Sequence, residues 1–372
     1  MNTMANVGAK LKGANETWIG FIIAEYQIAL FVGASVFGKF IPHLTPKYMI
    51  TIGLFVAGIC SALFGVLQWS PSGATFIAVG MTTRTIEGLG VASFFATTEM
   101  CYGVGMIFGP AIGGLLNQLG DEHLSGHGFC LPFFIMGSLL LLGSLLMRIL
   151  LPEIDPAKLN STDESESLGK TSVLGVLSNI NITVNVIISV NCFLLIGFNE
   201  ATLELYIADF ADLSPTTMGG IFVISGALYA GFNQVWAYFA EKMSNCHPLC
   251  IIGCTSSLVA FSIVGPLPFF GGDSQLWLTI LAQVFLGLGM GGQFVGSFVQ
   301  GLRETLKSGY PDNVSTYAVV SGIYSSSFAL GSAIGPALGG ILVAQFQYRM
   351  ATVPIAALQL LMVILLKHLT VN

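Results

Sequence analysis

Long apolar runs, each wide enough to cross a bilayer, constrain this sequence more than any other feature. A membrane-spanning helix needs about 20 mostly apolar residues, and eleven stretches meet that requirement. They cover residues 18–40, 49–67, 74–98, 100–119, 129–151, 183–206, 217–239, 247–264, 275–298, 317–343 and 350–368. The count falls to ten if the third and fourth runs, which lack a polar connection, form one span. The predicted fold class is an all-α integral membrane protein with the lipid bilayer as its partner.

Composition excludes functions that depend on a water-soluble surface. Hydrophobic residues make up 54% of the chain and charged residues 9%, and the mean hydropathy is +0.80. A soluble domain carries about 25% charged residues. No basic patch indicates nucleic acid, and no catalytic triad or zinc-binding pair of histidines indicates an enzyme. We therefore expect a monomeric, non-enzymatic membrane protein that uses no cofactor or metal.

The seven cysteines do not suggest a disulfide framework. All but Cys246 lie in apolar runs or at their edges, where a thiol behaves as a small hydrophobic group. Cys246, Cys250 and Cys254, together with His247, have a one-turn spacing that some metal sites use. Because the surrounding stretch is apolar, we interpret these residues as packing groups.

Basic residues orient the predicted bundle, since cytoplasmic loops carry an excess of lysine and arginine. They follow the first, fifth, seventh, ninth and last runs, whereas the intervening connections hold only Arg349. With eleven spans, this pattern places the N-terminus on the lumenal side. One cytoplasmic connection, 152–182, has the acidic, serine-containing composition of a flexible linker. It divides the chain into a predicted N-terminal bundle, 1–151, and a predicted C-terminal six-helix bundle, 183–372.

The two predicted bundles contain related sequences. Three pairs of segments match: 108–116 (FGPAIGGLL) with 334–342 (IGPALGGIL), 88–90 with 287–289, and 17–21 with 217–221. The same glycine-proline pattern at corresponding positions is strong evidence of an internal duplication. The duplication predicts two pseudo-symmetric helix bundles, with six spans each in the ancestral plan.

The register of this duplication changes inside the first bundle. The offset grows from 199 at Gly88 to 226 at Phe108, so the first bundle is 27 residues shorter over this stretch. The second bundle also begins with an apolar run, 183–206, for which the first bundle has no counterpart. We therefore expect the first bundle to lack its first helix and a segment near Thr98-Glu99, leaving 10 or 11 of twelve spans.

Two six-span bundles joined by a cytoplasmic linker resemble the organisation of the major facilitator superfamily. The segment 105–114, with Gly109-Pro110 and a second glycine pair, resembles that superfamily's fifth-helix antiporter motif. The segment from Arg84 to Gly90 (RTIEGLG) resembles its fourth-helix motif, an intramembrane arginine followed by a close-packing glycine pair. The loop 38–47 resembles the basic loop between helices two and three weakly, because its usual aspartate is absent.

Within the superfamily, the chain from about Asn15 onward is most similar to the vesicular amine and polyamine transporter group. Residues 198–203 (FNEATL) resemble the acidic segment of that group's seventh helix. The acids of the monoamine carriers are missing, since Ser325 stands at the eleventh-helix position and Gly292 or Gln293 at the tenth. The resemblance therefore implies the polyamine-like branch.

Ionisable residues inside the predicted spans are the candidate sites, because a charge at mid-membrane costs at least about 2.5 kcal/mol and is functional by default. Arg84 lies mid-span, and Glu87 follows one turn later, close enough to pair with it. This pair is either a proton-linked gate or substrate-site charge, or a structural ion pair. Glu25, with Gln27 nearby, is either a proton site or a protonated group bonded to a neighbouring helix.

A second acidic segment lies in the run 183–206. Glu200 and Glu204 share a helix face, where desolvation and mutual repulsion favour protonation of at least one carboxylate. Glu200 is the predicted proton and cation site, whereas Glu204 is expected at the lumenal helix end, in water. Asn199 and Asn191 either contact a substrate or bridge helices.

The repeated pairs Gly109-Pro110 and Gly335-Pro336 are the predicted conformational hinges. Glycine lets neighbouring backbones approach, and proline removes a helix hydrogen bond and permits a bend. Such hinges suit two bundles that rock against each other.

Together these features predict a secondary transporter that exchanges protons for a small organic cation, such as a polyamine, by alternating access. Its expected location is an intracellular vesicle membrane, with the plasma membrane as the alternative. Lumenal acid would protonate Glu200, with Glu25 as a second acceptor, and so release the cation. The alternative is a non-transporting form of such a carrier, either a truncated splice form or an incomplete gene model, which the missing first span and the 27-residue shortening motivate.

Overall fold

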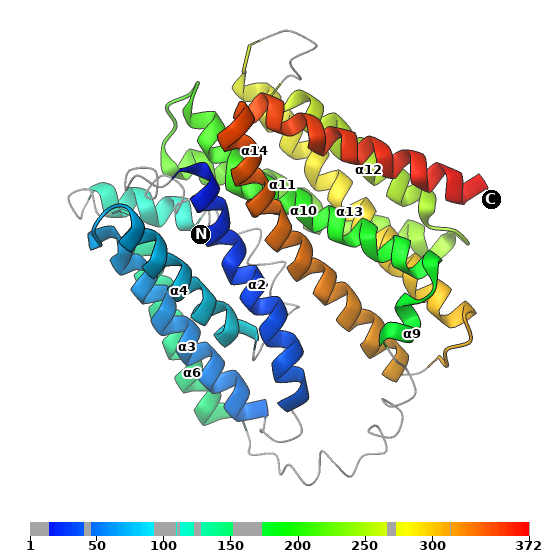
Figure 1. Cartoon of the computed structure of the whole chain (residues 1–372), viewed down its shortest axis with the longest axis horizontal. Helices are drawn as coiled ribbons and strands as arrows, with labels where there is room; N and C mark the ends of the chain where they lie inside the picture. The colour runs from blue at the N-terminus through cyan, green and yellow to red at the C-terminus, as the bar shows by residue number, and fades with distance from the viewer. Residues whose placement is uncertain are drawn as a thin grey trace. The chain divides into compact units, whose positions relative to one another are not determined.

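The structure is a computed structural model that describes residues 15–40, 46–92, 109, 112–122, 128–151, 173–265, 273–312 and 314–371. These residues are almost entirely helical, and no strand occurs among them (Figure 1). The all-α prediction is therefore confirmed. The described helices coincide with ten of the eleven predicted apolar runs, and residues 112–122 form a helix within the remaining one.

The first part of the chain contributes four long helices, α2 (Glu16–Phe40), α3 (Pro46–Val66), α4 (Ala74–Ala92) and α6 (Cys130–Leu150), and a 3-10 turn, η1 (Leu67–Trp69). Asn15 begins α2 as its cap, because its side-chain oxygen accepts a hydrogen bond from the Trp18 backbone N–H at 3.0 Å. Helix α3 begins with Pro46, whose missing N–H is needed least in the first turn of a helix.

The second part contains the short α9 (Val173–Leu177) and the long helices α10 (Ile180–Ala208), α11 (Pro215–Lys242), α12 (His247–Ile263), α13 (Leu276–Lys307) and α14 (Val314–Val371). Helix α14 is two helices joined at Gln347, whose φ of 62° and ψ of 162° are non-helical. This break falls inside the connection predicted between the last two apolar runs.

Six of the described helices are long and apolar enough to cross a membrane by length and composition alone: Lys47–Trp69, Cys130–Leu150, Ile180–Ala208, Pro215–Lys242, Leu276–Lys307 and Val319–Thr370. The last of these includes the break at Gln347. Helices α2 and α4 carry Glu25, Arg84 and Glu87 within their apolar sequences.

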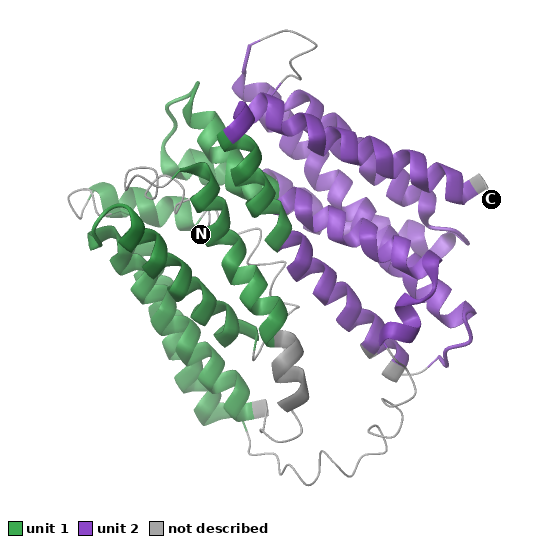
Figure 2. Ribbon diagram, in the orientation of Figure 1, with its two compact units in different colours: residues 1–162, 198–220, 333–344 green, residues 163–197, 221–332, 345–372 purple. Residues whose placement is uncertain are grey.

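The chain forms two compact units (Figure 2). Unit 1 contains residues 1–162, 198–220 and 333–344, and unit 2 contains 163–197, 221–332 and 345–372. The core of unit 1 includes Ile19, Ile22, Ile23, Phe64, Leu67, Phe76, Phe133 and Ala201. A core cluster of unit 2 joins α10, α12 and α14 through Val184, Ile188, Cys250, Cys254, Met362 and Leu366.

The predicted domain organisation differs from these units in one respect. Unit 1 contains the predicted N-terminal bundle, and it also takes the ends of α10 and α11 and part of α14. Most of the predicted linker, residues 152–172, lies outside the described residues. The division at 152–182 therefore stays a prediction.

Candidate functional site

A buried ion pair lies at the centre of unit 1. Arg84 and Glu87, both on α4, are 5% and 6% exposed. Nη1 of Arg84 donates a hydrogen bond to Oε2 of Glu87 at 3.0 Å. The pairing predicted from their one-turn spacing is confirmed. A helical separation of three residues brings the two side chains to the same face, so the pair needs no other element to form.

Aromatic rings from three other helices surround the guanidinium group of Arg84. Its carbon lies 4.1 Å from the ring centre of Phe64 on α3, 5.8 Å from that of Tyr26 on α2 and 5.9 Å from that of Phe133 on α6. A cation over an aromatic face is attracted by the negative face of the ring. These rings therefore stabilise a charge that the apolar interior otherwise disfavours.

The ion pair leaves part of Arg84 unsatisfied. Its Nε and Nη2 atoms are buried and have no hydrogen-bond partner among the described residues. Arginine stays charged in proteins, so these donors cannot be removed by loss of a proton. The site therefore holds a fixed positive charge whose single ionic partner in the described part of the chain, Glu87, is titratable.

Glu25 of α2 contacts Thr85, the residue after Arg84 on α4. Its Oε1 accepts a hydrogen bond from the Thr85 hydroxyl at 2.9 Å, which joins α2 to α4. Of the two readings of Glu25 taken from the sequence, a bond to a neighbouring helix is the one observed. A role in proton transfer stays a prediction.

The glycines of the same segment hold α4 close to its neighbours. A Cβ at Gly88 would lie 2.4 Å from the carbonyl oxygen of Tyr26 on α2. A Cβ at Gly90 would lie 3.1 Å from the carbonyl oxygen of Gly53 on α3. The close-packing glycine pair is thus present, and its approach to α2 brings Tyr26 and Arg84 together.

The acidic segment of α10 belongs to unit 1. Asn199 is 4% exposed, Glu200 is half-buried, and the adjacent Ala201 packs into the core with residues of α2, α3, α4 and α6. The expectation that Glu204 lies in water at the helix end is wrong, because this residue is 5% exposed and α10 continues to Ala208. Arg84 pairs with Glu87 rather than with either acid of α10.

The duplicated glycine motifs make two corresponding contacts within unit 1. A Cβ at Gly114 would lie 2.5 Å from the carbonyl oxygen of Pro215, at the start of α11. A Cβ at Gly340 would lie 2.4 Å from the carbonyl oxygen of Glu16, at the start of α2. In the internal repeat, Gly114 corresponds to Gly340, and the start of α2 corresponds to the start of α11. The glycine of the first repeat therefore contacts a helix start of the second repeat, and the glycine of the second repeat contacts a helix start of the first.

Side-chain hydrogen bonds accompany both contacts. Thr17 donates to the Gly340 carbonyl oxygen at 3.4 Å, and Thr216 donates to Gln118 Oε1 at 2.6 Å. By the charge pattern of the connections, both contacts are predicted to lie on the lumenal side of the membrane.

The predicted hinges are only partly visible. Pro110 lies outside the described residues, and no described atom lies within 4 Å of where a Cβ of Gly109 would project. Helix α14 continues with helical backbone angles through Gly335 and Pro336, and the carbonyl oxygen of Pro336 lies 2.3 Å from where a Cβ of Gly20 would be. Their role as hinges stays a prediction.

Unit 2 contains a buried network of neutral groups. Nδ2 of Asn191 donates to Oε1 of Gln293 at 2.9 Å and to Oε1 of Gln359 at 3.2 Å, and Gln359 donates back to Asn191 Oδ1 at 2.9 Å. Gln293 donates to the Ser257 hydroxyl at 2.8 Å. Asn191 therefore bridges α10 to α13 and α14, one of the two roles expected for it.

Sequence reasoning missed the rings around Arg84 and most of this amide network. Phe64 and Phe133 read as ordinary apolar residues, and Gln359 is a single polar residue in an apolar run. A lone amide in a predicted span is a usable signal, because such a group needs a partner inside the membrane. The identity of the partner has no local signature.

The Major Facilitator Superfamily model matches residues 94–308 of the chain. The MFS-type transporter SLC18B1 of Mus musculus is 30% identical over 358 residues, which is 90% of this chain and 74% of that protein. The Homo sapiens protein of the same name is 28% identical over 356 residues, with the same shares of the two chains.

Solved structures of similar fold include the nucleoside transporter NupG, with a TM-score of 0.71 and 13% identity over 99% of this chain and 94% of that one. The xylose transporter XylE from E. coli, in a partially occluded inward open conformation, has a TM-score of 0.64 and 14% identity. It aligns with 97% of this chain and 93% of its own. At these identities the likeness concerns the fold.

Proposed function

Because this chain belongs to the major facilitator superfamily, we propose that it is a proton-coupled antiporter for a small organic cation such as a polyamine. It is a membrane transporter rather than an enzyme. The proposed cycle moves the cation into an acidic vesicle in exchange for protons. The exchange proceeds by alternating access, in which the site opens to one side of the membrane at a time.

The observation that supports proton coupling most directly is the buried Arg84–Glu87 pair. An ionisable pair inside a membrane bundle is costly and is kept where the charge has a function. Since Arg84 is always charged, the net charge of the pair depends on Glu87 alone. The pair is neutral when Glu87 is ionised and carries one positive charge when Glu87 is protonated.

The change in net charge of the Arg84–Glu87 pair gives the proposed exchange its direction. When the acids are ionised, Glu25 and Glu200 attract an organic cation, and Asn199 offers a neutral hydrogen-bonding group. When lumenal acid protonates Glu200 and Glu87, that attraction weakens and Arg84 repels the cation. The cation leaves toward the lumen, and the protons leave later toward the less acidic cytoplasm.

The contacts of Gly114 and Gly340 are the proposed sites of the conformational change. Gly114 and Gly340 hold the starts of α11 and α2 at backbone distance on the predicted lumenal side. Separation of these two contacts would open a lumenal path, and their closure would block it. Separation of these contacts would break the hydrogen bonds that Thr17 and Thr216 donate.

The test is uptake of radiolabelled spermidine into liposomes that contain the purified chain and have an acidic interior. We expect accumulation that disappears with a protonophore and falls to background in Glu200→Gln and in Glu87→Gln. Glu241→Gln, at an exposed position near the end of α11, is the matched control and should accumulate like the wild type. Uptake that survives both substitutions would contradict the proposed coupling residues.

A non-transporting form of such a carrier is the second candidate, and the 27-residue shortening of the internal repeat favours it. The segment concerned, near Thr98-Glu99, lies outside the described residues. The same uptake experiment separates the two candidates. Accumulation by the chain as it stands eliminates the second, and its absence in a folded, reconstituted wild-type chain eliminates spermidine as the exchanged cation.

A further inference from the structure

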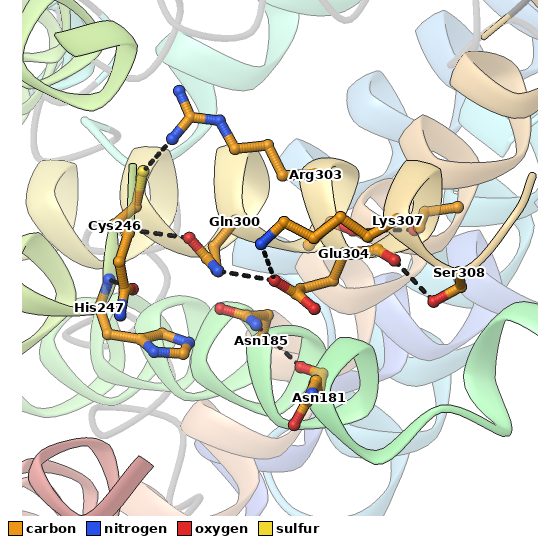
Figure 3. A network of polar contacts seen from close by, with 12 residues as sticks. Asn181, Asn185, Cys246, His247, Gln300, Arg303, Glu304, Lys307 and Ser308 are labelled. Carbon is orange, nitrogen blue, oxygen red and sulfur yellow. Dashed lines mark hydrogen bonds and ion pairs between the residues drawn. The ribbon is translucent and has the colours of Figure 1, made fainter. Parts of the chain in front are cut away.

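A polar cluster in unit 2 has no part in the proposed exchange. It consists of Asn185 on α10, His247 at the start of α12, and Gln300 and Glu304 on α13, and is called the His247 cluster below (Figure 3). In the view of Figure 3 the imidazole ring extends toward the amide of Asn185, with Gln300 and Glu304 above them. By the charge pattern of the connections, this end of unit 2 is predicted to face the cytoplasm.

Most polar atoms of the cluster have partners. Oε1 of Gln300 accepts from the Cys246 backbone N–H at 2.9 Å, and Nε2 of Gln300 donates to Oε1 of Glu304 at 3.0 Å. Lys307 donates to the same Glu304 oxygen at 2.9 Å. Nδ2 of Asn185 donates to the Asn181 carbonyl oxygen at 2.8 Å, within α10.

Three atoms form the exception. Both ring nitrogens of His247 and Oδ1 of Asn185 are buried and have no hydrogen-bond partner in the described part of the chain. His247 is 9% exposed and Asn185 is fully buried. An unpaired buried polar group costs about 1–3 kcal/mol, so these atoms offset part of the free energy that packing of α10, α12 and α13 contributes.

The charged groups around His247 do not offset that cost. Burial disfavours a charge on the ring most strongly, Glu304 favours it less strongly, and Lys307 disfavours it least. Helix α10 presents the neutral Asn181 and Asn185, and α14, which also packs against α12, contributes the apolar Met362 and Leu366. Cys246 directly precedes α12, and burial raises the pKa of its thiol, so this neighbour of His247 stays neutral. In the packed arrangement the imidazole forms no ion pair among the described residues.

The nearby Arg303 is already engaged. Its guanidinium donates to the carbonyl oxygens of Ala240, at 2.8 Å, and Met243, at the end of α11, and it also contacts the Cys246 sulfur at 3.3 Å. A positive charge at a helix C-terminus is favourable. Arg303 thus fixes the connection from α11 to α12, and His247 is the first residue beyond that fixed point.

We propose that His247 is a proton-sensing latch at the predicted cytoplasmic end of unit 2. While the imidazole is neutral, the first turn of α12 stays packed against α10, α13 and α14. Protonation places a charge in a buried site without a counter-ion, so it favours the arrangement in which this turn opens and the ring meets water. The latch does not depend on the proposed antiport or on its substrate.

The direction of the pH effect follows from linkage. An exposed imidazole gains its proton as the pH falls through about 6.5, whereas the buried ring resists protonation. The open arrangement therefore binds more protons and is favoured by acid. With one proton involved, its population rises about tenfold for each pH unit below that value.

The test is backbone hydrogen exchange of the full chain in lipid nanodiscs at pH 7.5 and pH 5.5, corrected for the intrinsic pH dependence of exchange. Peptides covering residues 247–252 should exchange about tenfold faster at pH 5.5 in the wild type. His247→Gln, which keeps a polar side chain but cannot titrate, should remove this acceleration. His368→Gln, at an exposed position near the end of α14, should leave it unchanged.

A second variant keeps the test decisive if His247→Gln disturbs packing. Asn185→Asp places a carboxylate where the unpaired amide oxygen lies, so it supplies the missing counter-ion and should suppress the acid-induced exchange. The proposal is overturned if the wild type shows no acceleration, or if acceleration persists in both His247→Gln and Asn185→Asp. None of these outcomes depends on spermidine uptake.

Discussion

The deep interior of unit 1 is charged, whereas that of unit 2 is held by neutral amides. In unit 1, Arg84 and Glu87 form an ion pair that leaves two guanidinium nitrogens without partners in the described part of the chain. In unit 2, Asn191, Gln293 and Gln359 join three helices, and the bond from Gln293 to Ser257 adds a fourth. Protons do not change the charge of a network of neutral amides, whereas one proton changes the net charge of an ion pair. The comparison places the switch of the proposed exchange in unit 1 and a rigid support in the amide network of unit 2, away from the His247 cluster.

The largest expected effect comes from breaking the charged pair. Glu87→Gln leaves Arg84 buried without an ionic partner and should lower the free energy of unfolding by about 3–5 kcal/mol. Replacing both residues, as in Arg84→Leu with Glu87→Leu, should restore most of this loss, because a buried pair can be exchanged for apolar groups at little cost.

Denaturant unfolding of the detergent-solubilised chain measures these differences. Glu241→Gln, an exposed carboxylate, should change stability by less than about 0.5 kcal/mol. If the double variant is no more stable than Glu87→Gln, the cost belongs to packing and not to the unpaired charge.

The neutral network should respond less strongly. Asn191→Leu removes the shared partner of Gln293 and Gln359 and should cost about 1–3 kcal/mol for the polar groups left unpaired. Gln345→Leu, on the exposed surface of α14, is the control. In transport assays Asn191→Leu should keep the wild-type dependence on lumenal pH, since no proton is exchanged at an amide. A shifted pH profile would remove the distinction between the two interiors.

The smallest expected effect concerns the link between α2 and α4. Thr85→Val removes the hydroxyl that donates to Glu25 and should cost about 0.5–1.5 kcal/mol. Thr82→Val is a matched control, because Thr82 is exposed and bonds only to the preceding turn of its own helix, at Ala78, among the described residues. Equal losses in the two variants, measured by thermal unfolding, would indicate that the bond to Glu25 contributes nothing.

Local features of the sequence predicted much of unit 1. The positions of the helices follow from apolar length, and the Arg84–Glu87 pair follows from a separation of one helical turn. The close approach of Gly88 and Gly90 follows from the absence of a side chain. The helix positions and the ion pair depend on residues that are near one another along the chain, so the sequence carries that information directly. The close packing of the two glycines was implied by the resemblance of their motif to a known family, because their partners Tyr26 and Gly53 lie on other helices.

Contacts between distant residues were harder to predict. Phe64 and Phe133 reach Arg84 from two other helices, and Gln359 reaches Asn191 across 168 residues. Glu204 was predicted to be exposed to water, but it is buried. The apolar pattern does not show how far α10 extends beyond this residue. Which face of an apolar helix meets which neighbour is decided by packing, because nearly all faces are equally apolar.

By itself the sequence determined that this chain is a bundle of membrane-spanning helices with an internal duplication, because both properties are written in residue order. It also determined that an arginine and a carboxylate share one helix face inside the membrane. Only the tertiary structure decided that aromatic rings enclose that arginine and that its remaining donors lack partners in the described part of the chain. It also decided that buried side-chain amides of unit 2 hydrogen-bond to one another. Those facts depend on helix pairing, which apolar sequences leave open until packing fixes it.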